Sequence, residues 1–243
     1  MGASPVSTVR LELLDGFQLV VDDHPVNALN SAQRLLAFLA LRGPVARVVA
    51  AGTLWGDVPE EQALASLRTT MWRCNRTVRG LVAVAQTRLA LASSVGVDVA
   101  DLIRGAAVVL DGRLGGTAAL PALRPMELLP GWYDDWVIFE RERLRQLRLH
   151  ALEAAAGRHA QDGQYAAALE CALAAVRAEP LRESAHRAVI TVHLAERNVN
   201  EAVRVYQEFR RLIVDELGIE PSEDLARLVF NGSRPVTPAE TVR

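Results

Sequence analysis

The sequence predicts a mainly α protein built from two unlike parts, and three observations lead to this. Strand-like and helical patterns alternate over residues 9–91, glycine and proline gather in residues 111–131, and the chain beyond them repeats at a period of 34 residues. Half of the 243 residues are apolar, which is enough to bury well-packed cores. We place the boundary at residues 98 and 99.

The first part, residues 9–98, has the layout of a winged helix-turn-helix with small antiparallel sheets. Strand patterns at 9–13, 17–21 and 26–29 surround the turn signal Asp15-Gly16. Helical patterns follow at 30–41, where Asn30 or Ser31 can cap the helix, then at 47–55 and 60–79. Two short apolar runs at 81–85 and 89–91 predict a hairpin, the wing of such a module.

The third helix of this part has two opposite faces. Apolar residues recur every three or four positions, at Leu64, Leu67, Met71, Cys74 and Val78. The other side and its margins carry side chains that can donate hydrogen bonds to phosphates and base edges: Ser66, Arg68, Thr69, Thr70, Trp72, Arg73, Arg76 and Arg79. One face is expected to pack on a core, and the other is free to contact a partner.

Positive charge is concentrated around this helix. Residues 62–97 contain no Asp or Glu but five arginines, although the whole chain has a net charge of −2. A local basic surface on a near-neutral chain is typical of a protein that binds double-stranded DNA. The alternative is a solvated helix face, but such faces usually mix both signs of charge.

Each candidate DNA-binding residue has an expected role. We expect Arg73 and Thr69 to meet base edges in the major groove. Phosphate contacts are assigned to Arg68, Thr70, Arg76 and Arg88, the last at the tip of the wing. Trp72 is expected to pack under the wing, with contact to a thymine methyl or a sugar as the alternative. The loop before the helix is acidic and is expected to be exposed, with Asp57, Glu60 and Glu61.

The second part, residues 99–231, is expected to be an all-α, tetratricopeptide-like superhelix, with a flexible tail at 232–243. His159 and His193 are 34 residues apart, as are Ala168 and Ala202, and this is the tetratricopeptide period. Helices are predicted at 101–110, 135–162, 164–178, 181–196, 199–216 and 222–230. Trp132, Tyr133 and Trp136 are expected to be mostly core residues at the start of this part.

Composition argues against several classes of function. All 27 basic residues are arginine, so a lysine-dependent phosphate loop and lysine Schiff-base chemistry are excluded. Cys74, Cys171 and the five histidines match no metal-binding spacing, so we expect buried free thiols, no metal and no cofactor. No catalytic arrangement is recognisable, and because the start of the sequence lacks a signal-peptide pattern and the apolar runs are short, neither a signal peptide nor a membrane span is expected. A cytoplasmic, nucleoid-associated protein without enzyme activity is the expectation.

Three longer motifs carry a family resemblance. Residues 128–137 read LLPGWYDDWV, residues 180–187 read PLRESAHR, and residues 216–222 read ELGIEPS. They are similar to signatures of the bacterial transcriptional activator domain, and beside a winged helix the chain resembles the Streptomyces antibiotic regulatory proteins. Members of that family typically have a small polar residue where Trp72 stands here.

The resemblance implies a transcriptional activator of a secondary-metabolite gene cluster. Such a protein would bind direct repeats in promoter DNA, two protomers per site, and recruit RNA polymerase through its sigma factor and alpha subunit. In similar winged helices the loop before the third helix touches RNA polymerase, which implies this role for Asp57, Glu60 and Glu61. The alternative from another class is a helical-repeat adaptor whose winged helix binds protein instead of DNA.

Overall fold

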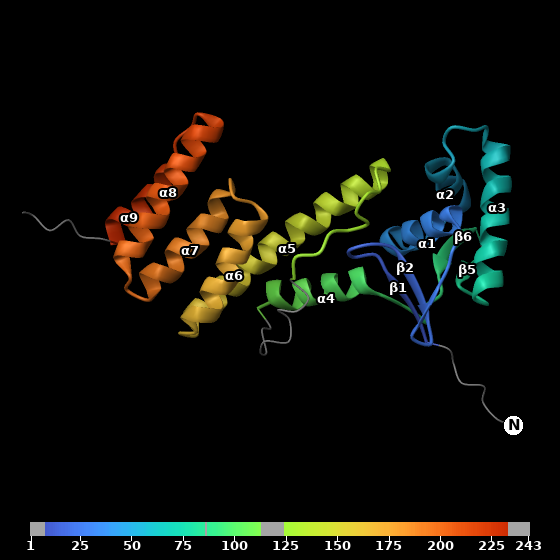
Figure 1. The fold of residues 1–243 in the computed structure, drawn as a ribbon, viewed down its shortest axis with the longest axis horizontal. Coiled ribbons are helices and arrows are strands. Elements are labelled where there is room, and N and C mark those ends of the chain that lie inside the picture. Colours follow the sequence, from blue (N-terminus) through green and yellow to red (C-terminus); the bar gives the residue numbers. More distant parts are fainter. Residues whose placement is uncertain (1–7, 86, 113–123, 233–243) are drawn as a thin grey trace, which may run out of the picture. The chain divides into compact units, whose positions relative to one another are not determined.

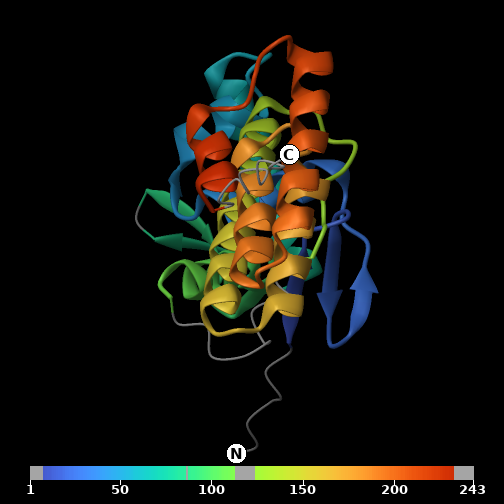
Figure 2. The ribbon, with the colours of Figure 1, turned by 90° about the vertical axis from the view of Figure 1, so that its left-hand side faces the viewer.

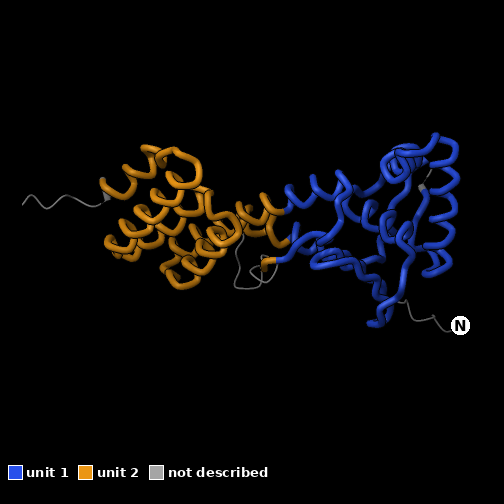
Figure 3. The backbone as a smooth tube through the Cα atoms, turned by 45° about the horizontal axis from the view of Figure 1, so that its top comes forward, with its two compact units in different colours: residues 1–104, 126–144 blue, residues 105–125, 145–243 orange. Residues whose placement is uncertain are grey.

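The structure is a computed structural model, and it describes residues 8–85, 87–112 and 124–232. The chain divides into two compact units (Figure 3). Unit 1 comprises residues 1–104 and 126–144, and unit 2 comprises residues 105–125 and 145–243. The prediction of a mainly α protein with small N-terminal sheets is confirmed. The expected tail and most of the glycine- and proline-rich segment lie outside the described residues.

A four-stranded sheet opens unit 1. Strands β1 (Val9–Glu12), β2 (Gln18–Val21) and β3 (His24–Val26) are antiparallel, and β7 (Val95–Val97) runs parallel to β1. The third strand lies two residues earlier than predicted. Asp22 and Asp23 adopt positive φ angles of 49° and 62°, so the chain turns there and His24 pairs with Val21. Strand β7 was not predicted, because its three residues are too few for a readable alternation.

Three helices and the wing complete the expected module. The helices are α1 (Asn30–Arg42), α2 (Arg47–Leu54) and α3 (Glu60–Thr77). The wing consists of β5 (Val82–Ala85) and β6 (Arg88–Leu91), and the two-residue strand β4 (Val45–Ala46) pairs with β6. The expected cap of α1 is wrong: Leu29 precedes the helix, and neither Asn30 nor Ser31 caps it. Instead the Gln33 side chain donates to the Ala28 carbonyl at 2.8 Å.

The core of unit 1 lies where the helices and both sheets meet. Helix α3 packs against α1 and α2, and α1 packs against β6 (Figure 1). Fully buried leucines occur on these helices, on β6, and on or beside β1 and β2, and burying each is worth about 1.5–3 kcal/mol relative to an exposed side chain. Those most deeply buried are Leu11, Leu13, Leu19, Leu35, Leu36, Leu39, Leu67 and Leu89. This core holds α3 by one face only.

Residues 126–144 belong to unit 1, although the sequence placed them after the boundary. The buried Trp136 meets Phe38 of α1 edge-on, with ring centroids 5.3 Å apart. Trp132 stacks on Phe17 at 6.2 Å. The core role expected for Trp136 is confirmed, whereas Trp132 is only half-buried, and the neighbours of both are unit 1 residues. Tyr133 does not share that role, because 82% of it is exposed.

Backbone contacts also hold this segment in place. The Leu129 amide donates to the Leu13 carbonyl at 2.9 Å, and the Asp15 amide donates to the Glu127 carbonyl at 2.7 Å. The Arg141 guanidinium donates to three carbonyls of the same segment, those of Leu128, Leu129 and Trp132. A single cation therefore satisfies carbonyl groups that no regular strand or helix would satisfy.

Two helices start in unit 1 and continue into unit 2: α4 (Asp98–Leu110) and α5 (Asp135–Gln161). The remaining helices are α6 (Tyr165–Ala178), α7 (Glu183–Ala195), α8 (Val199–Leu217) and α9 (Glu223–Gly232). Helix α6 packs against α7, α7 against α8, and α9 against both α7 and α8 (Figures 1 and 2). Their bounds agree with the predicted helices to within a few residues.

The 34-residue repeat reappears in the backbone of unit 2. Gly163 and Arg197, 34 residues apart, take left-handed φ angles of 73° and 65° in equivalent turns. In both turns the amide of the next residue donates to a histidine carbonyl five positions earlier, at 2.8 Å and 2.7 Å. Ala168 and Ala202 are fully buried one turn later. The small side chains allow close helix packing, as the repeat predicted.

A buried histidine makes the stability of unit 2 depend on pH. His186 stacks on Phe209, with centroids 4.2 Å apart, and its Nε2–H donates to the Pro180 carbonyl at 2.8 Å. Burial lowers the pKa of His186 below its ordinary value, although the Pro180 carbonyl and the Glu208 charge oppose this. A histidine in the unfolded chain has a pKa of about 6.5. Just below that pH the unfolded chain therefore binds a proton at His186 more readily than the folded chain does.

We predict that the free energy of unfolding is highest above about pH 6.5 and falls as the pH drops from there toward the lower folded pKa. His186→Gln keeps a donor for the Pro180 carbonyl but does not titrate, so its stability should change less between about pH 7.5 and about pH 5.5. Denaturant unfolding at both pH values measures this. Equal losses in the two proteins would contradict the assignment to His186.

Candidate nucleic-acid interface

The buried face of α3 determines which of its side chains can meet a partner. Ala63, Leu67, Met71 and Cys74 are buried, so the predicted apolar stripe is largely present. Leu64 is only half-buried, and Ala63 takes its place in the core. The stripe packs on α1 and α2 and leaves the opposite face of the helix uncovered.

Most of the expected contact residues lie on that uncovered face. The exposed ones are Arg68, Thr69, Trp72, Arg73, Arg76 and, at the start of β6, Arg88, while Ser66 is half-buried. Within the described residues, none of these arginines forms an ion pair with a carboxylate. Their positive charge is therefore not cancelled locally, and the fold gathers it on α3 and the wing.

Two expectations for this face are wrong. Thr70 is only 3% exposed, because it lies on the core side of α3, so its hydroxyl cannot reach a phosphate. Trp72 does not pack under the wing: 60% of it is exposed. The Arg76 guanidinium lies over its ring, 5.2 Å from the centroid. Trp72 and Arg76 are four residues apart on the helix, so they lie side by side on the exposed face, where a cation–π attraction holds them together.

One residue that the sequence reasoning missed ties α3 to the wing. Asn75 accepts a hydrogen bond from the Val82 amide at 2.9 Å and donates one to the Val82 carbonyl at 3.3 Å. Val82 begins β5, and the amide of Arg47 donates to the Thr87 carbonyl between β5 and β6. Helical periodicity gives no signal for Asn75, because it lies between the two faces.

The acidic loop before α3 is exposed as expected. Asp57, Glu60 and Glu61 all face solvent, and the two glutamates occupy the first turn of α3, where the helix dipole favours them. Gly56 allows the chain to pass close to α2, since a Cβ atom there would lie 2.9 Å from the Gly52 carbonyl oxygen. The carboxylates are thus held at the end of α3 that precedes its arginines.

The described residues hold no cluster of His, Cys, Asp or Glu side chains that could bind a metal ion. Both thiols are buried, and burial raises the pKa of Cys74 and of Cys171 to about 11, which disfavours the reactive thiolate. No helix in the described ranges is long and apolar enough to span a bilayer.

We predict that Asn75→Ala lowers the free energy of unfolding of the chain by about 1–3 kcal/mol, because it leaves the Val82 amide and carbonyl without partners. Thr77→Ala is the matched control: Thr77 is exposed on the same helix, and its hydroxyl only donates to the Arg73 carbonyl one turn earlier. Thermal unfolding of both variants measures the difference. An Asn75 variant as stable as the control would contradict the proposed tie.

Known proteins match both units of the chain. The bacterial transcriptional activator domain matches residues 83–230. Regulatory protein AfsR of Streptomyces coelicolor is 31% identical over 209 residues, which is 80% of this chain and 21% of AfsR. AfsR of Streptomyces griseus is 30% identical over 211 residues, with the same coverage. The chain thus spans about a fifth of the length of these curated relatives.

A solved structure shares the fold. Mycobacterium tuberculosis EmbR, in complex with a low affinity phosphopeptide, superimposes with a TM-score of 0.75 at 22% identity, covering 96% of this chain and 67% of EmbR. At that identity the likeness concerns the fold alone. The domain match spans more than half of the chain and includes all three motifs noted in the sequence. The chain therefore belongs to the family that carries the bacterial transcriptional activator domain, and its resemblance to the Streptomyces antibiotic regulatory proteins is confirmed.

Proposed function

We propose that this protein is a sequence-specific, DNA-binding transcriptional activator without catalytic activity. The observation that carries the proposal is the uncovered face of α3 beyond its first turn, which bears exposed arginines and no acid, since Glu60 and Glu61 lie in that first turn. In winged helix-turn-helix proteins the third helix enters the major groove, and the wing reaches a neighbouring phosphate or minor groove. Helix α3 and the wing residue Arg88 match that use.

The roles of individual side chains follow from their exposure. Arg73 and Thr69 would meet base edges, and Arg68, Arg76 and Arg88 would contact phosphates. The Thr69 hydroxyl donates to the Ala65 carbonyl at 3.1 Å, which leaves its lone pairs for a base donor. Trp72 would lie against a thymine methyl or a sugar, since its exposed ring can reach the groove wall.

The wider setting comes from the family. The resemblance to AfsR supports a role in the cytoplasm, at promoters of a secondary-metabolite gene cluster, with two protomers on direct repeats. The exposed carboxylates Asp57, Glu60 and Glu61 would then face RNA polymerase, where an acidic loop suits a basic surface on the sigma factor, with the alpha subunit as a further contact.

Titration of purified protein against the intergenic DNA beside its own gene tests the proposal. Log affinity should fall with log salt, by about 0.9 for each phosphate neutralised. Arg68→Ala should weaken binding to all sequences alike and lower this slope by about one. Arg73→Ala should instead lose about 1–3 kcal/mol of preference for the cognate site. Arg177→Ala, which removes an exposed arginine of unit 2, is the matched control.

The outcomes separate the alternatives. If Arg73→Ala weakens cognate and scrambled DNA equally, the base-reading role of Arg73 is wrong. If the wild-type protein binds no fragment even in dilute buffer, the DNA-binding proposal fails. The helical-repeat adaptor then becomes the better interpretation.

The acidic loop gives a second prediction. Reversing both Glu60 and Glu61 to Arg should cut transcription activation from a target promoter and leave DNA affinity undiminished, because repulsion replaces attraction toward polymerase. Changing both to Gln should have a smaller effect, since it only removes the attraction. In vitro transcription and gel shift on the same preparations measure the two properties. Loss of both together would refute the polymerase role of the loop.

A further inference from the structure

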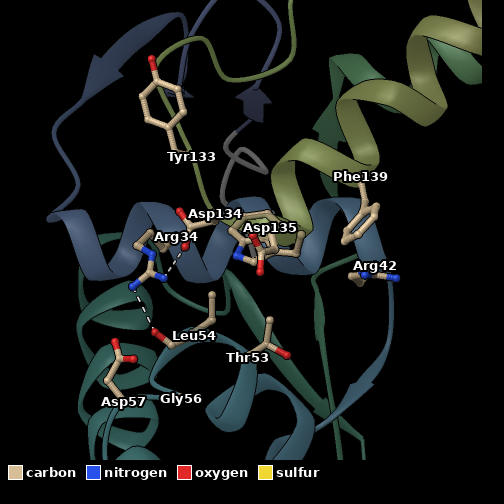
Figure 4. Close-up of a pocket in the computed structure, with 11 residues that line it drawn as sticks. Arg34, Arg42, Thr53, Leu54, Gly56, Asp57, Tyr133, Asp134, Asp135 and Phe139 are labelled. Atoms are coloured by element: carbon tan, nitrogen blue, oxygen red, sulfur yellow. Dashed lines mark hydrogen bonds and ion pairs between the residues drawn. The ribbon is translucent and has the colours of Figure 1, made fainter.

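A groove lies on unit 1 beside the acidic loop and shares Asp57 with it. Its volume is about 530 Å³. The walls come from α1, from the end of α2 with the loop after it, and from the start of α5 (Figure 4). The lining side chains include two arginines, three aspartates and two large exposed aromatic residues: Arg34, Arg42, Asp57, Asp134, Asp135, Tyr133 and Phe139.

Only part of the positive charge inside the groove is firmly paired. Arg34 donates to the Leu54 carbonyl at 3.0 Å and pairs with Asp134 at 2.5 Å (Figure 4). Arg42 is paired more weakly, because it lies 4.0 Å from the buried carboxylate of Glu140, which Arg143 contacts at 2.7 Å. Asp57 and Asp135 are exposed, and within the described ranges neither forms an ion pair. The carboxylates left over therefore favour a positively charged group and repel phosphate.

The aromatic side chains add an apolar surface at the same place. Phe139 is 71% exposed, and Figure 4 shows its ring beside Arg42 at one end of the groove, with Asp57 at the other. Exposing a phenylalanine ring to water is unfavourable, and an exposed apolar surface surrounded by charged groups is typical of a protein interaction site. The two ends thus suit a segment that carries a cationic and an apolar side chain a short distance apart.

We propose that this groove binds a short basic and apolar segment of the RNA polymerase holoenzyme. A Lys or Arg of the segment lies between Asp57 and Asp135, and an apolar side chain packs on Phe139. This inference rests on the proposed activator function and extends it, because Asp57 belongs to both the acidic loop and the groove. The polymerase-binding surface then continues from the loop onto the start of α5, within the matched activator domain.

The test measures binding of the full chain to purified Streptomyces coelicolor RNA polymerase holoenzyme in the absence of DNA. Asp57→Arg combined with Asp135→Asn should weaken binding about tenfold, and Phe139→Ala several-fold. Ile138→Ala is the matched control, because Ile138 is 44% exposed on the same turn of α5 and does not line the groove. Thermal unfolding verifies that the variants fold, and a gel shift reports DNA affinity on the same samples.

The expected result is weakened polymerase binding in the groove variants only, with undiminished DNA affinity and an unaffected Ile138 variant. If the groove variants bind polymerase like wild type, the groove proposal fails, while the activator proposal is untouched. If the wild-type chain binds DNA but no polymerase in this assay, the proposed occupant is wrong. If neither ligand binds, the proposed function itself fails.

Discussion

The packing of residues 126–144 onto the winged-helix core is the constraint on which the rest of the structure depends. Burial of Trp136 against Phe38 removes a large apolar surface from water, and the Arg141 clamp satisfies the carbonyls of the irregular segment before it. The motif at 128–137, a signature of the activator domain, is therefore built into unit 1. Helix α5 starts from this anchor and continues into unit 2.

The same packing decides which surfaces unit 1 leaves open. Helix α3 is held through one face, and the tie from Asn75 to the wing fixes its far end. Beyond the first turn its other face has no carboxylate to pair with the arginines, which supports the proposal that a polyanion binds there. At the start of α5, burial of Trp136 leaves Phe139 and Tyr133 outside. One unit thus presents a basic surface and, separately, an acidic and aromatic groove.

The proposals assign these two surfaces to different partners, and the surfaces differ in the sign of their charge. DNA requires cations that are not neutralised by the protein, which holds for α3 and the wing. Polymerase recruitment requires a surface that DNA does not compete for, and free carboxylates repel phosphate. The helical repeats of unit 2 add a stacked scaffold of the kind that presents surfaces to other proteins. The two AfsR relatives are similar to this chain over about a fifth of their own length.

The sequence by itself determined the features that depend on neighbours along the chain. Periodicity placed the three helices of the winged module and the helices of unit 2, and the 34-residue spacing of Ala168 and Ala202 predicted their close packing. The absence of acid over residues 62–97 marked the charged face of α3. Periodicity, repeat spacing and charge bias can all be read from the order of residues along the chain, without knowledge of contacts between distant residues.

Only the tertiary structure decided what depends on contacts between distant residues. Thr70 is buried and Trp72 is exposed in the structure. The periodicity of apolar residues predicts which side of α3 is buried, but it leaves the edge of that buried side uncertain by about one residue. The tertiary structure also added β7 to the sheet, assigned residues 126–144 to unit 1, and formed the groove from α1, α2 and α5. These features join positions up to about a hundred residues apart, as in the Arg34–Asp134 pair, and no local pattern encodes such a contact.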